Sequence, residues 1–126
     1  MHISEPWLAL FKVLLKDPKV TAQAGWEKIV LVGTAGGSTR MAGYSFDAAG
    51  AFKPVSPDLD ALLLLRQLHQ STKASDPAGQ SWRACLLRMA RNGAVGLELE
   101  CADATRWHVT AENLQQRIQE FAAMPV

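Results

Sequence analysis

The chain has 126 residues, of which 48% are hydrophobic, and its 13 basic and 12 acidic side chains give a formal net charge of +1. This length and composition support one domain, residues 1–126, with a hydrophobic core that needs no disulfide or metal to fold. The near-neutral charge argues against a general binder of nucleic acid or membranes, since sequence-independent affinity for phosphate requires an excess of cations.

The start of the chain does not have the features of an export signal. The first residues, MHISEPWLALFKVLL, lack a basic segment and include Glu5 and Pro6. No apolar run approaches the roughly 18 residues that a membrane-spanning helix needs. Cys85 and Cys101 have no companions at metal-binding spacing, so we expect both to be free, buried thiols. These features predict a cytosolic protein.

The first predicted element is a largely buried helix from residue 5 to about residue 17. Ser4 is a suitable N-cap, and Pro6 falls in the first turn, where a missing N–H costs nothing. Hydrophobic side chains cover most of this helix and leave only one narrow polar stripe. Pro18 is expected to end the helix.

The stretch IVLVGTAGGSTRMAGYSFD, residues 29–47, raises the main functional question of the sequence. A strand predicted from Trp26 to Thr34 runs into closely spaced glycines, which in a nucleotide site would let backbone N–H groups approach phosphates. The loop lacks both the Lys-Ser/Thr pair of a Walker motif and G-x-G-x-x-G spacing. It leads into residues 40–46, which alternate as a half-buried strand does. We therefore interpret Gly33–Gly37 as a hairpin tip, with a phosphate-binding loop as the alternative.

A third strand and a second helix are predicted next. The segment AFKPV, residues 51–55, forms a short strand that Pro54 restricts to its end or to a sheet edge. Residues 56–58, Ser-Pro-Asp, predict the start of a helix that runs to about Ser71. Its consecutive leucines, Leu62–Leu65, circle the helix axis. The helix is therefore either covered on two sides, as a central helix, or presents a leucine to a partner.

The segments SWRACLLRMA and AVGLELECA are predicted to form a hairpin. A two-residue Asn-Gly turn would bury Arg88 opposite Leu97, so we favour a three-residue loop, 91–93, with its glycine in the left-handed conformation. This loop aligns three pairs of side chains: Cys85 with Leu99, Leu87 with Leu97, and Met89 with Val95. The residues expected to face inward on the second strand are Val95, Leu97, Leu99 and Cys101. Glu98 and Glu100 then point outward, near Arg88.

A last helix is predicted after the capping residue Thr110, and it ends before Pro125. Leu114, Ile118 and Phe121 recur along it at helical spacing. Hairpins followed by helices, rather than alternating β and α units, predict an α+β fold. We expect a single domain with an antiparallel sheet of about four to five strands in hairpins. Three helices, N-terminal, central and C-terminal, are expected to pack mainly on one face.

Residues that could support catalysis are scattered along the chain. His2, His69 and His108 have no second ligand at helical spacing, and no zinc site is predicted. The serine of GGSTR lacks a nucleophile elbow, and neither cysteine has an activating neighbour. Glu98 and Glu100 could form a carboxylate pair, although solvation is the simpler interpretation. The four tryptophans are expected to be part core and part rim. We expect no enzymatic activity, no metal and no cofactor.

Several short motifs together resemble the YezG-like immunity proteins. They are W-x-x-I-x-L from Trp26, Y-x-F-D-x-x-G-x-F from Tyr44, L-x-x-L-R-Q in the central helix, and W-R-x-x-L-L-R-x-x-R-N-G from Trp82 leading into LELE. Members of this family are small cytosolic antidotes to the toxic C-terminal domain of secreted or contact-delivered bacterial toxins. Such toxins are often nucleases, as in contact-dependent growth inhibition. The resemblance implies stoichiometric binding of one toxin domain without catalysis.

If the chain neutralises a toxin, acidic side chains that the fold does not need are expected to gather where the toxin docks. The candidates are Asp47, Asp58 and Asp60 around the third strand, and Glu98 and Glu100 on the outer face of the sheet. Asp58 is also expected to stabilise the helix through a favourable interaction with the helix dipole, whereas Asp60 and Glu100 have no evident structural role. The competing hypotheses are a small nucleotide-binding protein or enzyme that uses the glycine loop, and a scaffold subunit.

Overall fold

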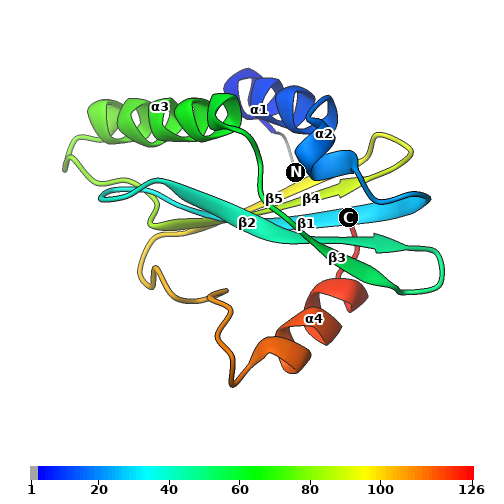
Figure 1. The fold of residues 1–126 in the computed structure, drawn as a ribbon. Coiled ribbons are helices and arrows are strands. Elements are labelled where there is room, and N and C mark those ends of the chain that lie inside the picture. Colours follow the sequence, from blue (N-terminus) through cyan, green and yellow to red (C-terminus); the bar gives the residue numbers. More distant parts are fainter. Residues whose placement is uncertain (1–2) are drawn as a thin grey trace.

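The computed structural model describes residues 3–126, and His2, one of the three histidines considered as a metal ligand, lies outside them. The chain forms a five-stranded antiparallel sheet in the order β3-β2-β1-β4-β5, with helices on both faces (Figure 1). The predicted α+β domain with four to five antiparallel strands in hairpins is thus confirmed. The elements are α1 (Glu5–Leu15), α2 (Pro18–Thr21), β1 (Trp26–Thr34), β2 (Arg40–Asp47), β3 (Phe52–Val55), α3 (Leu59–Ser75), β4 (Ala84–Ala90), β5 (Val95–Glu100) and α4 (Leu114–Ala123).

The sheet has a hydrophobic core on each face. The larger core lies under α1, α2 and α3, and the smaller one lies under α4 on the opposite face (Figure 1). Successive strand residues point to opposite faces, so that Ile29 and Leu31 enter the larger core while Val30 enters the smaller one. Over Arg40–Tyr44 the strand β2 alternates between exposed and buried residues, as predicted for a half-buried strand, whereas Ser45 and Phe46 near its end are both buried, on opposite faces. Helical periodicity identifies an apolar stripe on α4, but it does not say which sheet face that stripe covers.

Pro18 begins a helix instead of simply ending the previous one. The helix α1 stops at Leu15, and the short α2 starts at Pro18, where proline is tolerated in the first turn. Asp17 is its N-cap, because an Asp17 carboxylate oxygen accepts the N–H of Lys19 at 2.9 Å. Ser4 occupies the N-cap position of α1, but its side chain makes no capping hydrogen bond.

The helix α3 starts at Leu59, later than the Ser-Pro-Asp segment predicts, and extends to Ser75 rather than Ser71. Asp58 is its N-cap and accepts the N–H of Leu59 at 2.9 Å. The N–H of Asp58 donates to Oδ2 of Asp17 at 2.7 Å. This contact between distant parts of the chain places the cap at Asp58, and a local sequence pattern cannot reveal it.

The strand pairings agree closely with the predicted hairpins. Pro54 lies in β3, which is an edge strand as predicted. Leu87 pairs with Leu97 across β4 and β5, which is the predicted register, and Gly93 in the intervening loop has the expected positive φ of 94°. Gly43 permits a close approach of β2 to β1, because a Cβ atom there would overlap the carbonyl oxygen of Val30.

Two residues predicted to face inward on the last strand are exposed. Leu99 is 42% exposed although it has the predicted partner, Cys85, because it lies at the end of an edge strand. The strand β5 ends at Glu100, so Cys101 lies in the following loop and is exposed, whereas Cys85 is buried. The prediction of two buried thiols is therefore wrong for Cys101.

The tryptophans are more deeply buried than predicted. All four are 7% exposed or less, which places them in the core rather than partly at the rim. Trp82 packs against Trp7 with ring centroids 5.5 Å apart, and thereby joins the segment before β4 to α1. Arg106 lies over the ring of Trp107, 4.8 Å from its centroid, and helps to cover it.

The C-terminal helix is held to the sheet by both apolar and polar contacts. The predicted cap is three residues early, because regular helix begins at Leu114 with Asn113 at the N-cap position. The Oγ1 of Thr110 instead accepts the N–H of Asn113 at 3.3 Å in the turn before the helix. Phe121 is fully buried, and Lys28 of β1 donates to the carbonyl oxygen of Met124 at 2.9 Å. A cation at this end of a helix also interacts favourably with the helix dipole. None of the helices in residues 3–126 has the length and hydropathy of a bilayer-spanning segment.

Candidate functional site

The five acidic residues predicted to bind a partner do not form one surface. Asp47 lies at the end of β2, and Asp58 and Asp60 lie at the start of α3, on the side of the edge strand β3. Glu98 and Glu100 belong to β5, which is the opposite edge of the sheet. One partner segment cannot contact both groups without spanning the whole sheet.

Two members of the first group have structural roles. The carboxylate of Asp47 accepts the N–H groups of Ala49 at 3.0 Å and Ala51 at 2.8 Å, and so closes the turn between β2 and β3. Asp58 caps α3 and forms an exposed ion pair with Lys19 at 3.2 Å. The hydrogen bond from the Leu59 N–H, followed by the contact with Lys19, lowers the pKa of Asp58 below its usual value.

Glu98 and Glu100 also have partners within the chain. Glu98 lies near Arg88, as predicted, and forms an ion pair with it at 3.6 Å. Glu100 accepts the N–H groups of Ala102 at 2.9 Å and Asp103 at 3.0 Å, and it pairs with Arg106 at 3.0 Å. These backbone hydrogen bonds, with that from Arg106, lower the pKa of Glu100. Glu100 therefore shapes the turn after β5, and the expectation that it has no structural role is wrong.

Asp60 differs from the other four acidic residues. It lies exposed in the first turn of α3 and takes part in none of the ion pairs formed by residues 3–126. Leu63, Leu64 and Gln67 follow it at the spacings i+3, i+4 and i+7, so the four side chains share one side of the helix. Asp60 is therefore the predicted site residue with the fewest internal duties.

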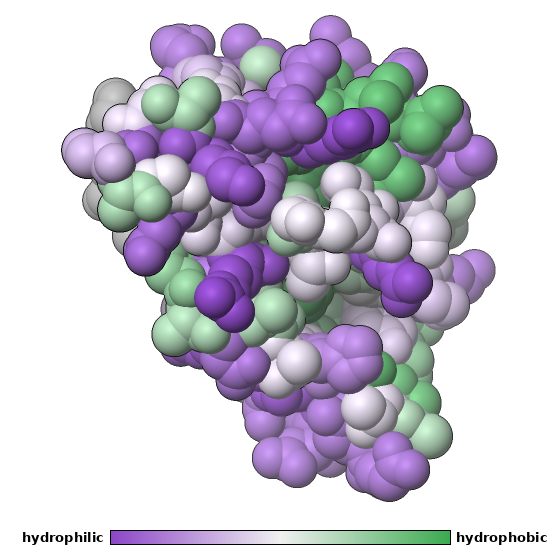
Figure 2. Space-filling view, turned by 90° about the vertical axis from the view of Figure 1, so that its left-hand side faces the viewer, coloured by the Kyte–Doolittle hydropathy of each residue, from purple (hydrophilic) through white to green (hydrophobic). Residues whose placement is uncertain are grey.

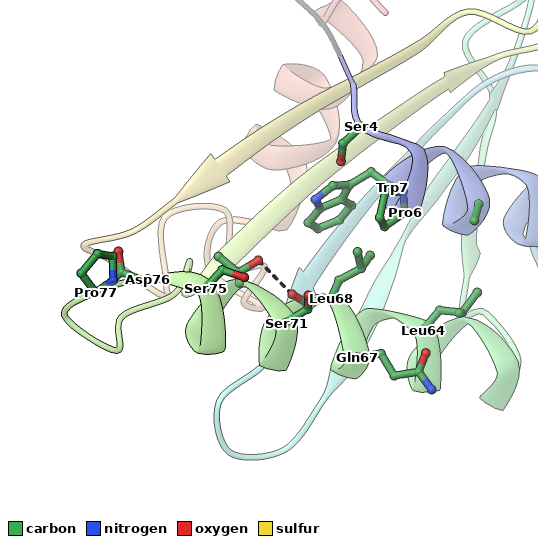
Figure 3. A pocket seen from close by; sticks show the side chains of 12 residues that line it. Ser4, Pro6, Trp7, Leu64, Gln67, Leu68, Ser71, Ser75, Asp76 and Pro77 are labelled. Atoms are coloured by element: carbon green, nitrogen blue, oxygen red, sulfur yellow. Dashed lines mark hydrogen bonds between the residues drawn. The ribbon is translucent and has the colours of Figure 1, made fainter.

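A groove runs between α1 and α3 beside this stripe. It encloses about 610 Å³, and Trp7 of α1 faces Leu68 of α3 across it (Figure 3). Leu64 lines the same wall as Leu68, while Ser71 and Ser75 continue that wall towards the C-terminal end of α3. The groove thus has an apolar part near the middle of α3 and hydroxyl groups towards its end.

Two leucines next to the groove are exposed to solvent. Leu59 is 62% exposed and Leu63 is 46% exposed, whereas Leu65 is fully buried against the sheet. The hydrophobic patch at the upper right of Figure 2 lies on the side of the molecule that α3 occupies. Of the two interpretations of the leucine run, the helix covered on two sides is wrong because Leu63 is exposed, whereas a leucine presented to a partner stays a prediction. Sequence reasoning missed Leu59, although its spacing of four residues from Leu63 was the available signal.

The glycine loop is the tip of the β1–β2 hairpin. Thr34 pairs with Arg40 on either side of it, and the chain continues into a strand rather than a helix. His69 of α3 packs edge to face with Trp82, with ring centroids 5.1 Å apart. Burial raises the pKa of the Cys85 thiol to about 12. Among residues 3–126, no three His, Cys, Asp or Glu side chains are grouped as a metal site requires.

No model of a known protein family matches the chain, and no curated protein matches it. Exposed apolar side chains beside a groove are typical of surfaces that bind another protein. The candidate functional site is therefore the "α3 surface", which consists of Leu59, Asp60 and Leu63 together with the groove residues Trp7, Leu64 and Leu68.

Proposed function

We propose that this chain is an immunity protein, which acts in the cytoplasm and neutralises the toxic C-terminal domain of a bacterial toxin. It binds the toxin one to one and performs no catalysis itself. The observation that carries the proposal is the exposure of Leu59 and Leu63 beside the groove between α1 and α3. The motifs that resemble YezG-like immunity proteins support the choice of this class of binding protein over a scaffold subunit.

The α3 surface is suited in size and composition to an interface of ordinary dimensions. The 17 residues of α3 extend over about 25 Å, at a rise of about 1.5 Å per residue. A typical partner covers roughly 800 Å² on each protein, with apolar anchors in the centre and charged groups at the rim. Leu63 would provide a central anchor and Asp60 a rim charge, because they lie on the same side of the helix.

The proposal is tested first with the protein encoded immediately upstream. A large secreted protein there would be the expected source of the toxin, and its purified C-terminal domain is the probe. We expect a one-to-one complex with this chain and protection of bacteria that express the toxin domain. If the domain is toxic but neither binds this chain nor is neutralised by it, the proposed function is wrong.

The binding surface is tested with matched leucine variants. Leu63→Ser removes an apolar group from the α3 surface, and Leu114→Ser removes one of similar exposure, 38%, from the opposite face of the sheet. At an interface centre the first change is expected to cost about 2 kcal/mol or more, which is roughly thirtyfold in Kd. The second change should leave Kd within twofold. Equal effects of the two changes would refute the α3 surface as the docking site.

The acidic group is tested in the same assay. Asp60→Ala is compared with Glu112→Ala, since Glu112 is exposed before α4 on the far side of the sheet. A rim charge changes mainly the association rate and its dependence on salt. We expect slower association for Asp60→Ala only, with melting temperatures measured for both variants as the control. Unchanged association for Asp60→Ala would exclude Asp60 from the interface.

A further inference from the structure

On its other flank, α3 borders a second concave region, which we call the cationic cleft. Its walls are the tip of the β1–β2 hairpin, the C-terminal half of α3 and residues 79–83 before β4. Two adjoining cavities of about 490 and 230 Å³ form it, and both are lined by Gly36, His69 and Lys73. The larger volume is within the range of sites that accept a small molecule or a few side chains of a partner.

The cleft is lined by cations from two directions. Arg66 and Lys73 lie seven residues apart on the same side of α3, and the ring of His69 lies between them. Arg83 contributes a positive charge from the segment before β4. No aspartate or glutamate is among the residues that line either cavity. The net charge of the whole chain is only +1, so positive charge is concentrated here.

These cations have no carboxylate partner within the described chain. The ion pairs of residues 3–126 use the basic side chains of Lys19, Arg88, Arg106 and Arg117. Arg66, Lys73 and Arg83 take part in none of them. The acidic residue nearest to Lys73 in sequence, Asp76, instead accepts the N–H groups of its own loop. Like charges gathered in a concave site repel one another and raise the local concentration of anions.

The walls of the cleft are held in place by the fold. The ring of His69 packs edge to face with Trp82, which is only 2% exposed. The hydroxyl of Ser81 donates to the carbonyl oxygen of His69 at 3.1 Å, and so ties the segment before β4 to α3. Gly36 has a φ of 114°, which favours glycine, and it places the hairpin tip next to the His69 ring. Figure 2 looks onto this end of the molecule, where a pale central surface is flanked by strongly hydrophilic side chains.

We propose that the cationic cleft receives an acidic segment of the toxin domain that binds the α3 surface. This inference rests on the proposed function, and it reverses the expected charge relation, in which acidic groups of this chain meet a basic partner. Four of the five predicted acidic residues are engaged inside the fold, while Arg66, Lys73 and Arg83 are not. The groove and the cleft lie on opposite flanks of α3. A partner that binds over Leu63, on the exposed side of α3, can therefore also contact the cleft.

The test uses the same upstream-encoded toxin domain and two matched double variants of the full chain. Arg66→Gln with Lys73→Gln removes two charges from the cleft, and Lys12→Gln with Lys16→Gln removes two exposed charges from the α1 region. Association and dissociation rates are measured at several salt concentrations, with melting temperature as a control for folding. We expect the cleft variant to bind about tenfold or more weakly at low salt and to lose most of its salt dependence. The α1 variant should stay within twofold of the parent.

Each outcome decides between this inference and the proposed function. No complex with the parent chain would overturn both, whereas a complex that depends on Leu63 but not on Arg66 and Lys73 would overturn only the acidic segment. Equal losses in the two double variants would show a general charge effect and refute the cleft. A separate titration of the chain with inorganic pyrophosphate identifies the competing ligand. Tight, saturable binding of pyrophosphate, with toxin binding unaffected by the cleft variant, would assign the cleft to a small phosphate compound and refute the proposal.

Discussion

Leu97 and Leu99 provide a direct test of how the last strand is covered. The two leucines lie on the same strand and point to the same face, but Leu97 is 7% exposed and Leu99 is 42% exposed. Leu97 lies in the larger core, opposite Leu87, whereas Leu99 lies at the end of the edge strand. Truncation to alanine removes the same atoms at both positions. A difference in the loss of unfolding free energy therefore measures the difference in burial of the two side chains.

The expected costs follow from these exposures. Leu→Ala removes roughly three methylene equivalents, each of which contributes about 0.8 kcal/mol when buried, for a total of about 2.4 kcal/mol. A closed site retains part of the space as a cavity, which brings Leu97→Ala to about 3 kcal/mol. At Leu99 almost half of the side chain is already in water and the space opens to solvent, so we expect about 1 kcal/mol.

Urea unfolding followed by tryptophan fluorescence measures both free energies of unfolding. The slopes of the two transitions should equal that of the parent, because a changed slope would indicate a change in the denatured state. If Leu99→Ala costs as much as Leu97→Ala, the end of β5 is covered in solution. Leu99 would then be as buried as Leu97, and the edge of the sheet would not be open to solvent at this point.

Three further predictions concern the thiols, the exposed turn after β5 and a close strand contact. In the folded protein a thiol reagent at pH 8 should modify Cys101 only, because burial holds the pKa of Cys85 at about 12; fast modification of both would contradict this. Glu100→Gln should lower the melting temperature at pH 7, where the folded-state pKa of Glu100 is depressed and its charged form is stabilised. The difference in melting temperature should disappear as the pH falls through the usual pKa of a glutamate and then through the lower pKa of folded Glu100. A difference that does not change with pH would show that the charge of Glu100 does not contribute to stability. Gly43→Ala should cost about 3 kcal/mol by forcing β2 from β1, whereas Gly37→Ala, which meets nothing within 4 Å, should be nearly neutral in the same denaturant melts.

The parts of the fold that the sequence predicts well are those governed by local patterns. The bounds of β1 follow from a β-branched run between turn signals, and the β4–β5 register is the predicted one. Arg88, which that register was expected to leave in water, is nevertheless only 15% exposed and pairs with Glu98. The start of α3 could not be found in this way, since the bond from the Asp58 N–H to Asp17 joins distant parts of the chain. The face that α4 covers was equally inaccessible, because periodicity within a helix carries no information about the sheet beneath it.

The candidate site shows the same division. The sequence indicates that Glu98 and Glu100 point outward, but the hydrogen bonds that Glu100 makes to the following turn depend on where β5 ends. The leucine run indicates an excess of apolar side chains on α3 without showing which of them remain exposed. Only the packing of Leu65 against the sheet identifies Leu63 as a leucine that stays in solvent.

The order of the strands also bears on how fast the chain folds. All other neighbouring strands in the sheet are consecutive in sequence, but β1 pairs with β4 across a loop that contains β2, β3 and α3. Closing such a loop costs chain entropy before the new contacts compensate for it, so we infer that joining β1 to β4 limits the folding rate. Shortening a side chain where β1 pairs with β4, as in Leu31→Val or Leu87→Val, should slow refolding. Changes at the β4–β5 turn should mainly accelerate unfolding. Rates of refolding and unfolding are measured for these variants. If Leu31→Val and Leu87→Val leave the refolding rate unchanged, the pairing of β1 with β4 does not limit folding.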